Sequence, residues 1–240
     1  MAAALLLTAG CGAHTLPAIH SEAERLQVAR RMLDEHEWSQ ANELLKTYVD
    51  TDAGSADVDQ AIYLLGLSYL KMKEWASAQV EFERLLRDYP ESDSSGSASF
   101  RLGEALFGQS RGPDFDQEFT LKALQQWESY RQSYPGHWLQ PEAARRITET
   151  RSRLAQKLLN TGKLYLKLKL GEPARVYFQR VLDEYGDAPQ AGEATIGLAL
   201  AEAILGKKQR AVERLKEIET QFQGQPIAAR AAKERARLKE

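Results

Sequence analysis

The chain has 240 residues, of which 43% are hydrophobic and 28% charged, with a formal net charge of -2 at pH 7 and a single cysteine. This length and apolar content suffice for one continuous core, and the nearly balanced charge argues against a general nucleic-acid binder. A single cysteine excludes an internal disulfide framework and a cysteine metal cluster.

The N-terminus is predicted to be a lipoprotein signal peptide over residues 1–10. It is an uncharged apolar run, too short to span a bilayer, and residues 7–11 read Leu-Thr-Ala-Gly-Cys. This ending resembles a lipobox, although no Lys or Arg precedes the run. The resemblance implies that the Cys11 sulfur carries a diacylglyceryl group and that residues 11–20 form a tether. The alternative is that residues 1–11 are merely a frayed apolar N-terminus.

After the tether, a block of small and aromatic residues recurs five times at helical spacing. In the second copy, Gly66 and Ala78 are expected where two helices cross, and Phe82 in the groove beside them. This is the pattern of the tetratricopeptide repeat, a pair of antiparallel helices. The predicted repeat-packing residues are Ala29, Ala41, Gly66, Tyr69, Ala78, Phe82, Pro90, Gly103, Ala123, Gly162, Tyr165, Ala174, Phe178, Ala199 and Ala211.

The repeats are unevenly spaced. The marker alanines at 41, 78, 123, 174 and 211 are 37, 45, 51 and 37 residues apart, whereas the standard repeat has about 34. Residues 108–118 are rich in Gly, Pro and Asp and are predicted to be a loop. Residues 141–170 contain no helix breaker except Gly162, which predicts one long helix or two nearly collinear ones.

Helix-start signals agree with this register. Ser21 with Glu24, and Asp57 with Gln60, are spaced as capping boxes or close variants. Proline residues at 141 and 173 are expected in the first turn of a helix. The N–H groups of that turn make no hydrogen bond within the helix, so their absence in proline costs none.

We therefore predict an all-α tetratricopeptide-repeat solenoid of about five helix pairs that forms a right-handed superhelix. Five repeats are expected over residues 21–225 and a C-terminal capping helix over 226–240. The segment from Lys207 onward is locally basic. A solvated cap on the last repeat explains this better than a lipid-binding or partner-binding patch, because terminal repeats need a polar outer face.

No catalytic constellation stands out. The four histidines lack the i, i+4 spacing of a helical metal site, and the chain has no glycine-rich phosphate loop or Gly-x-Ser-x-Gly elbow. We predict a non-enzyme with no cofactor and no metal, because such repeats build binding surfaces.

The combination of features is similar to the BamD (YfiO) family of outer-membrane assembly lipoproteins. The resemblance lies in the lipobox cysteine, the short tether, the five repeats with endings such as Asp88-Tyr89-Pro90, the enlarged third repeat and the long helix before the fourth. It covers most of the chain. Its specificity comes from the combination, because the single repeat is common to many proteins.

This resemblance implies a lipid-anchored scaffold on the periplasmic face of the outer membrane. Its implied partners are a BamA-like POTRA-domain protein, further subunits of the assembly complex, and the C-terminal segments of unfolded β-barrel proteins. The family contacts its POTRA-bearing partner through the C-terminal repeats. The family's partner-contacting arginine falls at Tyr177 here, with Arg175 and Arg180 nearby, so these three residues mark the candidate partner-contact region.

A peptide-binding surface is expected on the first helices of the repeats, which line the inner face of a solenoid. Aromatic and cationic groups there would suit an extended peptide with aromatic side chains and a terminal carboxylate. The candidate residues are Arg30, Tyr63, Leu67, Phe100, Arg101 and Glu104. Alternatively, Tyr63 and Phe100 pack between neighbouring repeats.

Two other non-catalytic functions fit a repeat lipoprotein. A Tol-Pal-associated envelope coordinator would be expected to carry an N-terminal coiled-coil segment, whereas the repeats here begin at about residue 21. A type IV pilus pilotin would have repeats closer to the standard spacing. A helical lytic transglycosylase would need a further lysozyme-like domain, for which the repeats leave no room.

Overall fold

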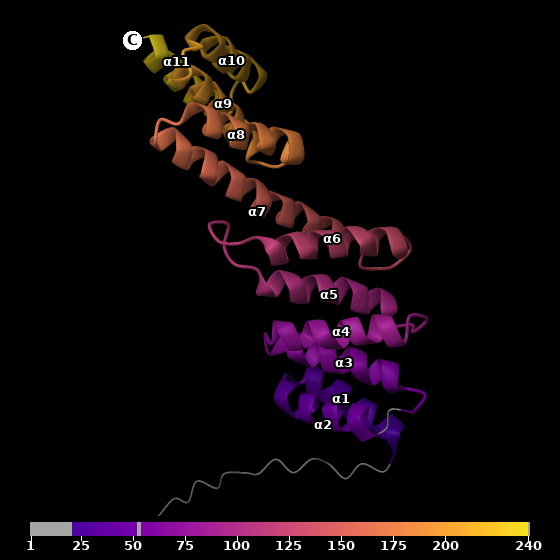
Figure 1. Cartoon of the computed structure of the whole chain (residues 1–240). Helices are drawn as coiled ribbons and strands as arrows, with labels where there is room; N and C mark the ends of the chain where they lie inside the picture. Colours follow the sequence, from indigo (N-terminus) through magenta and orange to yellow (C-terminus); the bar gives the residue numbers. More distant parts are fainter. Residues whose placement is uncertain (1–20, 52–53, 240) are drawn as a thin grey trace, which may run out of the picture.

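The computed structural model describes residues 21–51 and 54–239 (Figure 1). Within these ranges the chain forms eleven α-helices and no strand. The helices are α1 (Glu22–Asp34), α2 (Trp38–Thr51), α3 (Val58–Lys71), α4 (Trp75–Asp88), α5 (Ser95–Gln109), α6 (Glu118–Ser133), α7 (Gln140–Lys167), α8 (Gly171–Tyr185), α9 (Ala191–Ile204), α10 (Lys208–Gln221) and α11 (Pro226–Lys239). The all-helical prediction is confirmed.

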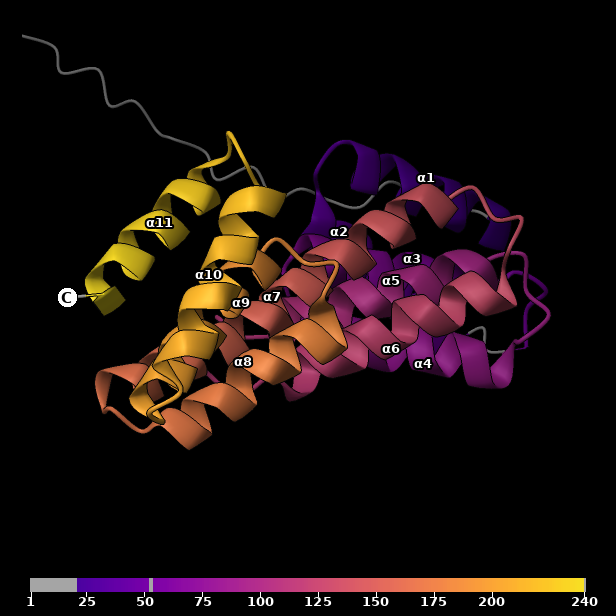
Figure 2. The ribbon, with the colours of Figure 1, turned by 90° about the horizontal axis from the view of Figure 1, so that it is seen from above.

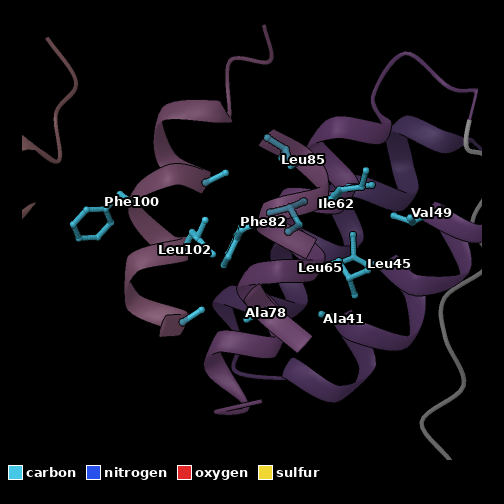
Figure 3. Packing of buried hydrophobic residues seen from close by; sticks show 14 of the residues in the cluster. Ala41, Leu45, Val49, Ile62, Leu65, Ala78, Phe82, Leu85, Phe100 and Leu102 are labelled. Atoms are coloured by element: carbon cyan, nitrogen blue, oxygen red, sulfur yellow. The ribbon is translucent and has the colours of Figure 1, made fainter. Parts of the chain in front are cut away.

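The helices form a solenoid of five consecutive pairs followed by α11. Each helix packs on the next, and first helices of successive pairs also touch: α1 with α3, α3 with α5, α7 with α9, and α9 with α11. The buried side chains form three adjoining clusters, one from α1 to the start of α7, one among α6 to α9, and one among α9 to α11. Figure 3 shows part of the first cluster, with Phe82 between α3 and α5.

Glycine residues lie where the paired helices approach most closely. A Cβ atom added to Gly66, Gly103 or Gly162 would lie 2.6, 2.4 or 2.7 Å from the aromatic ring of its own pair's second helix. Those rings belong to Phe82, Trp127 and Phe178, and all three are fully buried. Side chains therefore exclude any residue larger than glycine at these crossings.

The long helix predicted before the fourth repeat is a single helix, α7, of 28 residues. It crosses from the block of α1 to α6 to the block of α8 to α11 (Figures 1 and 2). The predicted loop lies between α5 and α6 and is held against α7. Arg153 donates to the Ser110 hydroxyl, Lys157 to the Asp114 carbonyl, and Asn160 to the Asp114 carboxylate.

Of the two predicted side-chain caps at helix starts, one is present. The Ser21 side chain accepts a hydrogen bond from the Glu24 N–H, as predicted, at 3.1 Å. Asp57 is the N-cap of α3 but makes no side-chain capping bond, because its backbone is not in the extended conformation of a capping residue. Pro90 was expected among the packing residues, but it is exposed in the turn after α4.

The predicted signal peptide, Cys11 and the tether lie outside the described residues. Among the residues that the structure does describe, no helix is both long and apolar enough to cross a membrane.

Candidate peptide-binding groove

The first helices of the early repeats form a groove with two adjoining cavities. One, of about 560 Å³, lies against α1 and α3, and the other, of about 690 Å³, is lined by residues of α3, α5 and α7. Leu67 and Lys71 border both cavities. An extended chain could therefore pass from one cavity to the other along α3.

The smaller cavity combines a cation with aromatic walls. Arg30 is exposed and donates a hydrogen bond of 2.6 Å to the Gln60 side-chain oxygen. Tyr63 is half-buried, and its ring centroid lies 6.1 Å from that of the buried Phe82. Tyr63 thus belongs both to the packing between helices and to the cavity wall.

The larger cavity is cationic. Its wall carries Lys71, Arg101, Arg146 and Arg153, against one carboxylate, Glu104. The Glu104 carboxylate bridges two of these cations, at 2.6 Å from Arg101 and 3.3 Å from Arg146. The net positive charge of the wall favours an anionic ligand.

Apolar surface lies beside these charges. The Arg153 guanidinium stands 4.3 Å from the centroid of the Phe107 ring, and Trp75 lies against the backbone of Gly108. Leu67 and Leu70 complete the apolar part of the wall. The cavity therefore offers apolar contact and charge-assisted hydrogen bonding within one space, which suits a peptide with an aromatic side chain beside a carboxylate.

Arg101 is a largely enclosed cation of this set. Burial alone would lower the pKa of its guanidinium, but the facing Glu104 carboxylate and the Tyr63 hydroxyl together outweigh that effect, so the pKa is raised and the group stays charged. Its Nε atom is buried and has no hydrogen-bond partner. An unsatisfied buried donor is costly, so this atom lowers the stability of the folded groove.

The candidate residues do not all reach the groove. Arg30, Leu67 and Glu104 each directly follow the small residue at a helix crossing, and all three line a cavity. Phe100 was expected at the surface, but it is fully buried and packs on Trp127 and Tyr130 of α6. In Figure 3 it leaves α5 on the side opposite Leu102. Phe100 therefore packs within its own helix pair and does not reach the groove.

Several lining residues were missed by sequence reasoning. Lys71 and Gly108 lie four residues beyond Leu67 and Glu104, so the repeat register itself could have revealed them. Arg146 and Arg153 carried no such signal, because they belong to α7, whose extra length takes it outside the standard repeat.

The candidate partner-contact residues all lie on α8 but do not form one cluster. Arg175 pairs with Glu172 at 2.5 Å, and Arg180 pairs with Glu184 at 2.8 Å, both along the same helix. Tyr177 instead stacks on Tyr165 of α7, with ring centroids 5.5 Å apart. These contacts leave α8 a mixed surface of paired charges and a half-buried aromatic.

Metal binding has no visible basis in the described part of the chain. Between residues 21 and 239, apart from 52 and 53, no three His, Cys, Asp or Glu side chains come together in a way that could hold a metal ion.

The paired helices, the glycine-aromatic crossings and the concave groove define a tetratricopeptide-repeat protein. Residues 20–218 match the model of the YfiO family, described as outer membrane lipoproteins, and the chain belongs to that family. This is the BamD type of lipoprotein, as the sequence features indicated.

Solved structures of tetratricopeptide-repeat proteins are similar to this chain at low sequence identity. The chain is 19% identical to YrrB, a TPR protein with an unusual peptide-binding site, with 89% of this chain and 92% of that one covered and a TM-score of 0.38. It is 16% identical to a thermophilic TPR protein from Thermus thermophilus, with 89% and 98% covered and a TM-score of 0.42. The search of curated proteins returned no match.

Proposed function

We propose that this protein is a non-catalytic scaffold in the assembly and insertion of β-barrel outer-membrane proteins. Its body would face the periplasm and be held at the outer membrane by lipid on Cys11. The observation that carries the proposal is the match of residues 20–218 to the outer membrane lipoprotein family YfiO. The groove adds a surface on which such a scaffold could hold a client chain.

The proposed client is the C-terminal segment of an unfolded barrel protein. Arg30 and Arg101 stand at the two cavities of the groove and would pair with a terminal carboxylate. Phe107 and Trp75 would contact an aromatic side chain near that terminus. Because the ligand is small and extended, we expect weak affinity, in the micromolar range or poorer.

The proposed partner is a BamA-like protein with POTRA domains, together with other assembly subunits. It would contact the C-terminal repeats, in the region of Arg175, Tyr177 and Arg180 on α8. The groove is lined by the N-terminal half of α7, whereas these residues lie on α8, so the two contacts would be separable by mutation.

The first experiment measures binding of a fluorescent peptide that ends in phenylalanine with a free carboxylate. The double substitution Arg30→Glu and Arg101→Glu would oppose the carboxylate and should abolish binding. The matched control is Arg87→Glu with Lys122→Glu, two exposed cations on the second helices α4 and α6. The control should bind as the wild type does, and an amidated peptide should bind neither protein.

A second measurement tests the partner. Crosslinking in cell envelopes should join the protein to a POTRA-bearing protein, and the groove double variant should retain this crosslink. Peptide binding that survives the charge reversal would reject the groove residues. Absence of a POTRA crosslink in the wild type would reject the assembly function in favour of a Tol-Pal-associated or pilotin role.

A further inference from the structure

Two exposed leucines lie on one face at the C-terminal end of α7, Leu164 within the helix and Leu168 at its C-cap. The exposed fractions are 54% for Leu164 and 57% for Leu168. They are four residues apart, so their side chains lie one above the other on the helix surface. Exposed leucines at this spacing form an apolar stripe rather than an isolated contact.

In the second, third and fifth repeats, the residue at the first of these two positions is buried. The position lies two residues after the small residue at the helix crossing, where α3, α5 and α9 have Ser68, Ala105 and Ala201. All three side chains are fully buried. Ser68, for example, accepts a hydrogen bond of 2.8 Å from Asn42 on α2.

The residue at the second position, six residues after the crossing, likewise contacts the second helix of the preceding repeat. Ser39 of α2 donates to the Met72 sulfur at 3.6 Å. Gln109 donates to Gln79 of α4 at 2.7 Å, and Leu205 packs on the backbone of Gly171 at the start of α8. A second helix therefore covers this face of α3, α5 and α9.

At α7 the covering helix is too short. The helix α7 has 28 residues and α6 has 16, and they run antiparallel from a common turn. Figure 1 shows the C-terminal end of α7 extending past the start of α6. The loop before α6 reaches only as far as Asn160, which bonds Asp114. Beyond it, the face with Leu164 and Leu168 is bare.

The C-terminal part of α7 and the turn that follows it also carry cations close to these leucines. The sequence from residue 150 to residue 171 contains six Lys or Arg and no Asp or Glu. Lys163 pairs with Glu193 of α9, but Lys167 and Lys169 are exposed and form no ion pair with any described residue. A binding partner would therefore bring acidic groups beside an apolar stripe.

We propose that the Leu164 and Leu168 face is a docking surface for an amphipathic helix of another protein, with an apolar stripe and acidic flanks. The docked helix would take the place that a preceding second helix takes at α3, α5 and α9. This inference is independent of the groove and of the proposed client. A basic helix with exposed leucines could also contact anionic lipid. The equivalent faces of α3, α5 and α9 are each covered by a helix, so we propose a helix as the ligand of this face.

The test uses the full chain and an 18-residue helical peptide with leucines along one face and glutamates on the other. Two matched peptides replace the glutamates by lysines or the leucines by serines. The acidic leucine peptide should bind in a fluorescence anisotropy titration. The other two should bind at least about tenfold more weakly, because each lacks one half of the complementarity.

Variants then locate the site. The double substitution Leu164→Ser and Leu168→Ser should weaken binding of the acidic peptide by about tenfold or more without lowering the melting temperature, since both side chains are exposed. The matched control, Val80→Ser with Leu121→Ser, removes two exposed apolar residues from α4 and α6 and should leave binding unchanged. Lys167→Glu should also weaken binding, whereas Lys46→Glu should not.

Three results would overturn the proposal. One is binding of the acidic peptide that is unaffected by the double serine substitution. Another is that the lysine peptide binds with the same affinity as the acidic peptide. The third is that the protein binds none of the peptides but attaches to phosphatidylglycerol vesicles through Leu164 and Leu168, which would identify the face as a lipid contact.

Discussion

The ring of Phe178 lies directly against the backbone of Gly197, so a Cβ atom added to Gly197 would be only 2.4 Å from the Cζ atom of the ring. Phe178 belongs to α8 and Gly197 to α9. The same ring also excludes a Cβ atom at Gly162 of α7, at 2.7 Å. One buried phenylalanine thus packs between two glycines of successive first helices, and so joins the fourth repeat to the fifth.

Replacing Gly197 by alanine should therefore destabilise the protein. Alanine favours a helix over glycine by about 1 kcal/mol, but the fully buried ring has no space into which to move. We expect a net loss of about 1–3 kcal/mol in the free energy of unfolding, measured by urea denaturation. Gly136→Ala is the control, since nothing lies within 4 Å of its added Cβ atom. Equal stability of the two variants would contradict this packing.

A similar test applies to the crossing of α3 and α4. Ala78 is fully buried there, so Ala78→Leu forces extra methylene groups into the interface and should cost about 1–3 kcal/mol. Glu74→Gln, at an exposed position before α4, should change stability by less than about 0.5 kcal/mol. Identical melting temperatures would remove support for the repeat register.

His137 gives the stability a pH dependence. Its Nδ1 atom accepts the Leu139 N–H at 3.3 Å and lies 2.8 Å from the Tyr130 hydroxyl, while its Nε2 atom lies 3.3 Å from the Ser97 hydroxyl. Burial lowers the pKa of His137, so the folded state favours the neutral ring. A proton on Nδ1 would also prevent this atom from accepting the Leu139 N–H, and the two N–H groups would repel each other.

The sign of the effect follows from that lowered pKa. Below the ordinary histidine value of about 6.5, the unfolded chain binds a proton more readily than the folded protein does, so stability falls as the pH is lowered through this range. The midpoint of urea denaturation should be lower at pH 5.5 than at pH 7.5. His137→Asn should reduce that difference, and a variant with the full wild-type pH dependence would exclude His137 as its source.

The lipid anchor is tested by Cys11→Ser. Each buried methylene contributes about 0.8 kcal/mol, so two or more acyl chains would hold the protein on a membrane almost irreversibly. The substituted protein should appear in the periplasmic fraction, and the wild type should stay in the membrane fraction at high salt. If the variant remains membrane-bound at high salt, Cys11 is not the anchor.

The fold was predictable because its determinants are local and repeated. Small residues such as Gly66 and Ala78 recur at fixed offsets from an aromatic, and only such residues allow two helices to approach closely. The absence of a breaker other than Gly162 between Pro141 and Leu170 likewise predicted one long helix or two nearly collinear ones, and the structure contains one. The YfiO family was recognisable from the same features, and the family match agrees.

The groove was predictable only in part. Arg30, Leu67 and Glu104 share one offset in the repeat, so their place on the inner face follows from helix periodicity alone. Phe100 has an aromatic side chain suited to a ligand, but its exposure depends on how α6 packs against α5, and Trp127 and Tyr130 bury it.

The helix pairs, the crossing residues and the family can be recognised in the amino-acid sequence, because each depends on contacts within or between neighbouring helices. The role of α7 becomes visible only in the folded molecule. Its extra length carries Arg146 and Arg153 into the cationic cavity and leaves Leu164 and Leu168 without a covering helix. The physical reason is that such contacts depend on where a helix of non-standard length meets its neighbours in space, and periodicity along the chain does not encode that position.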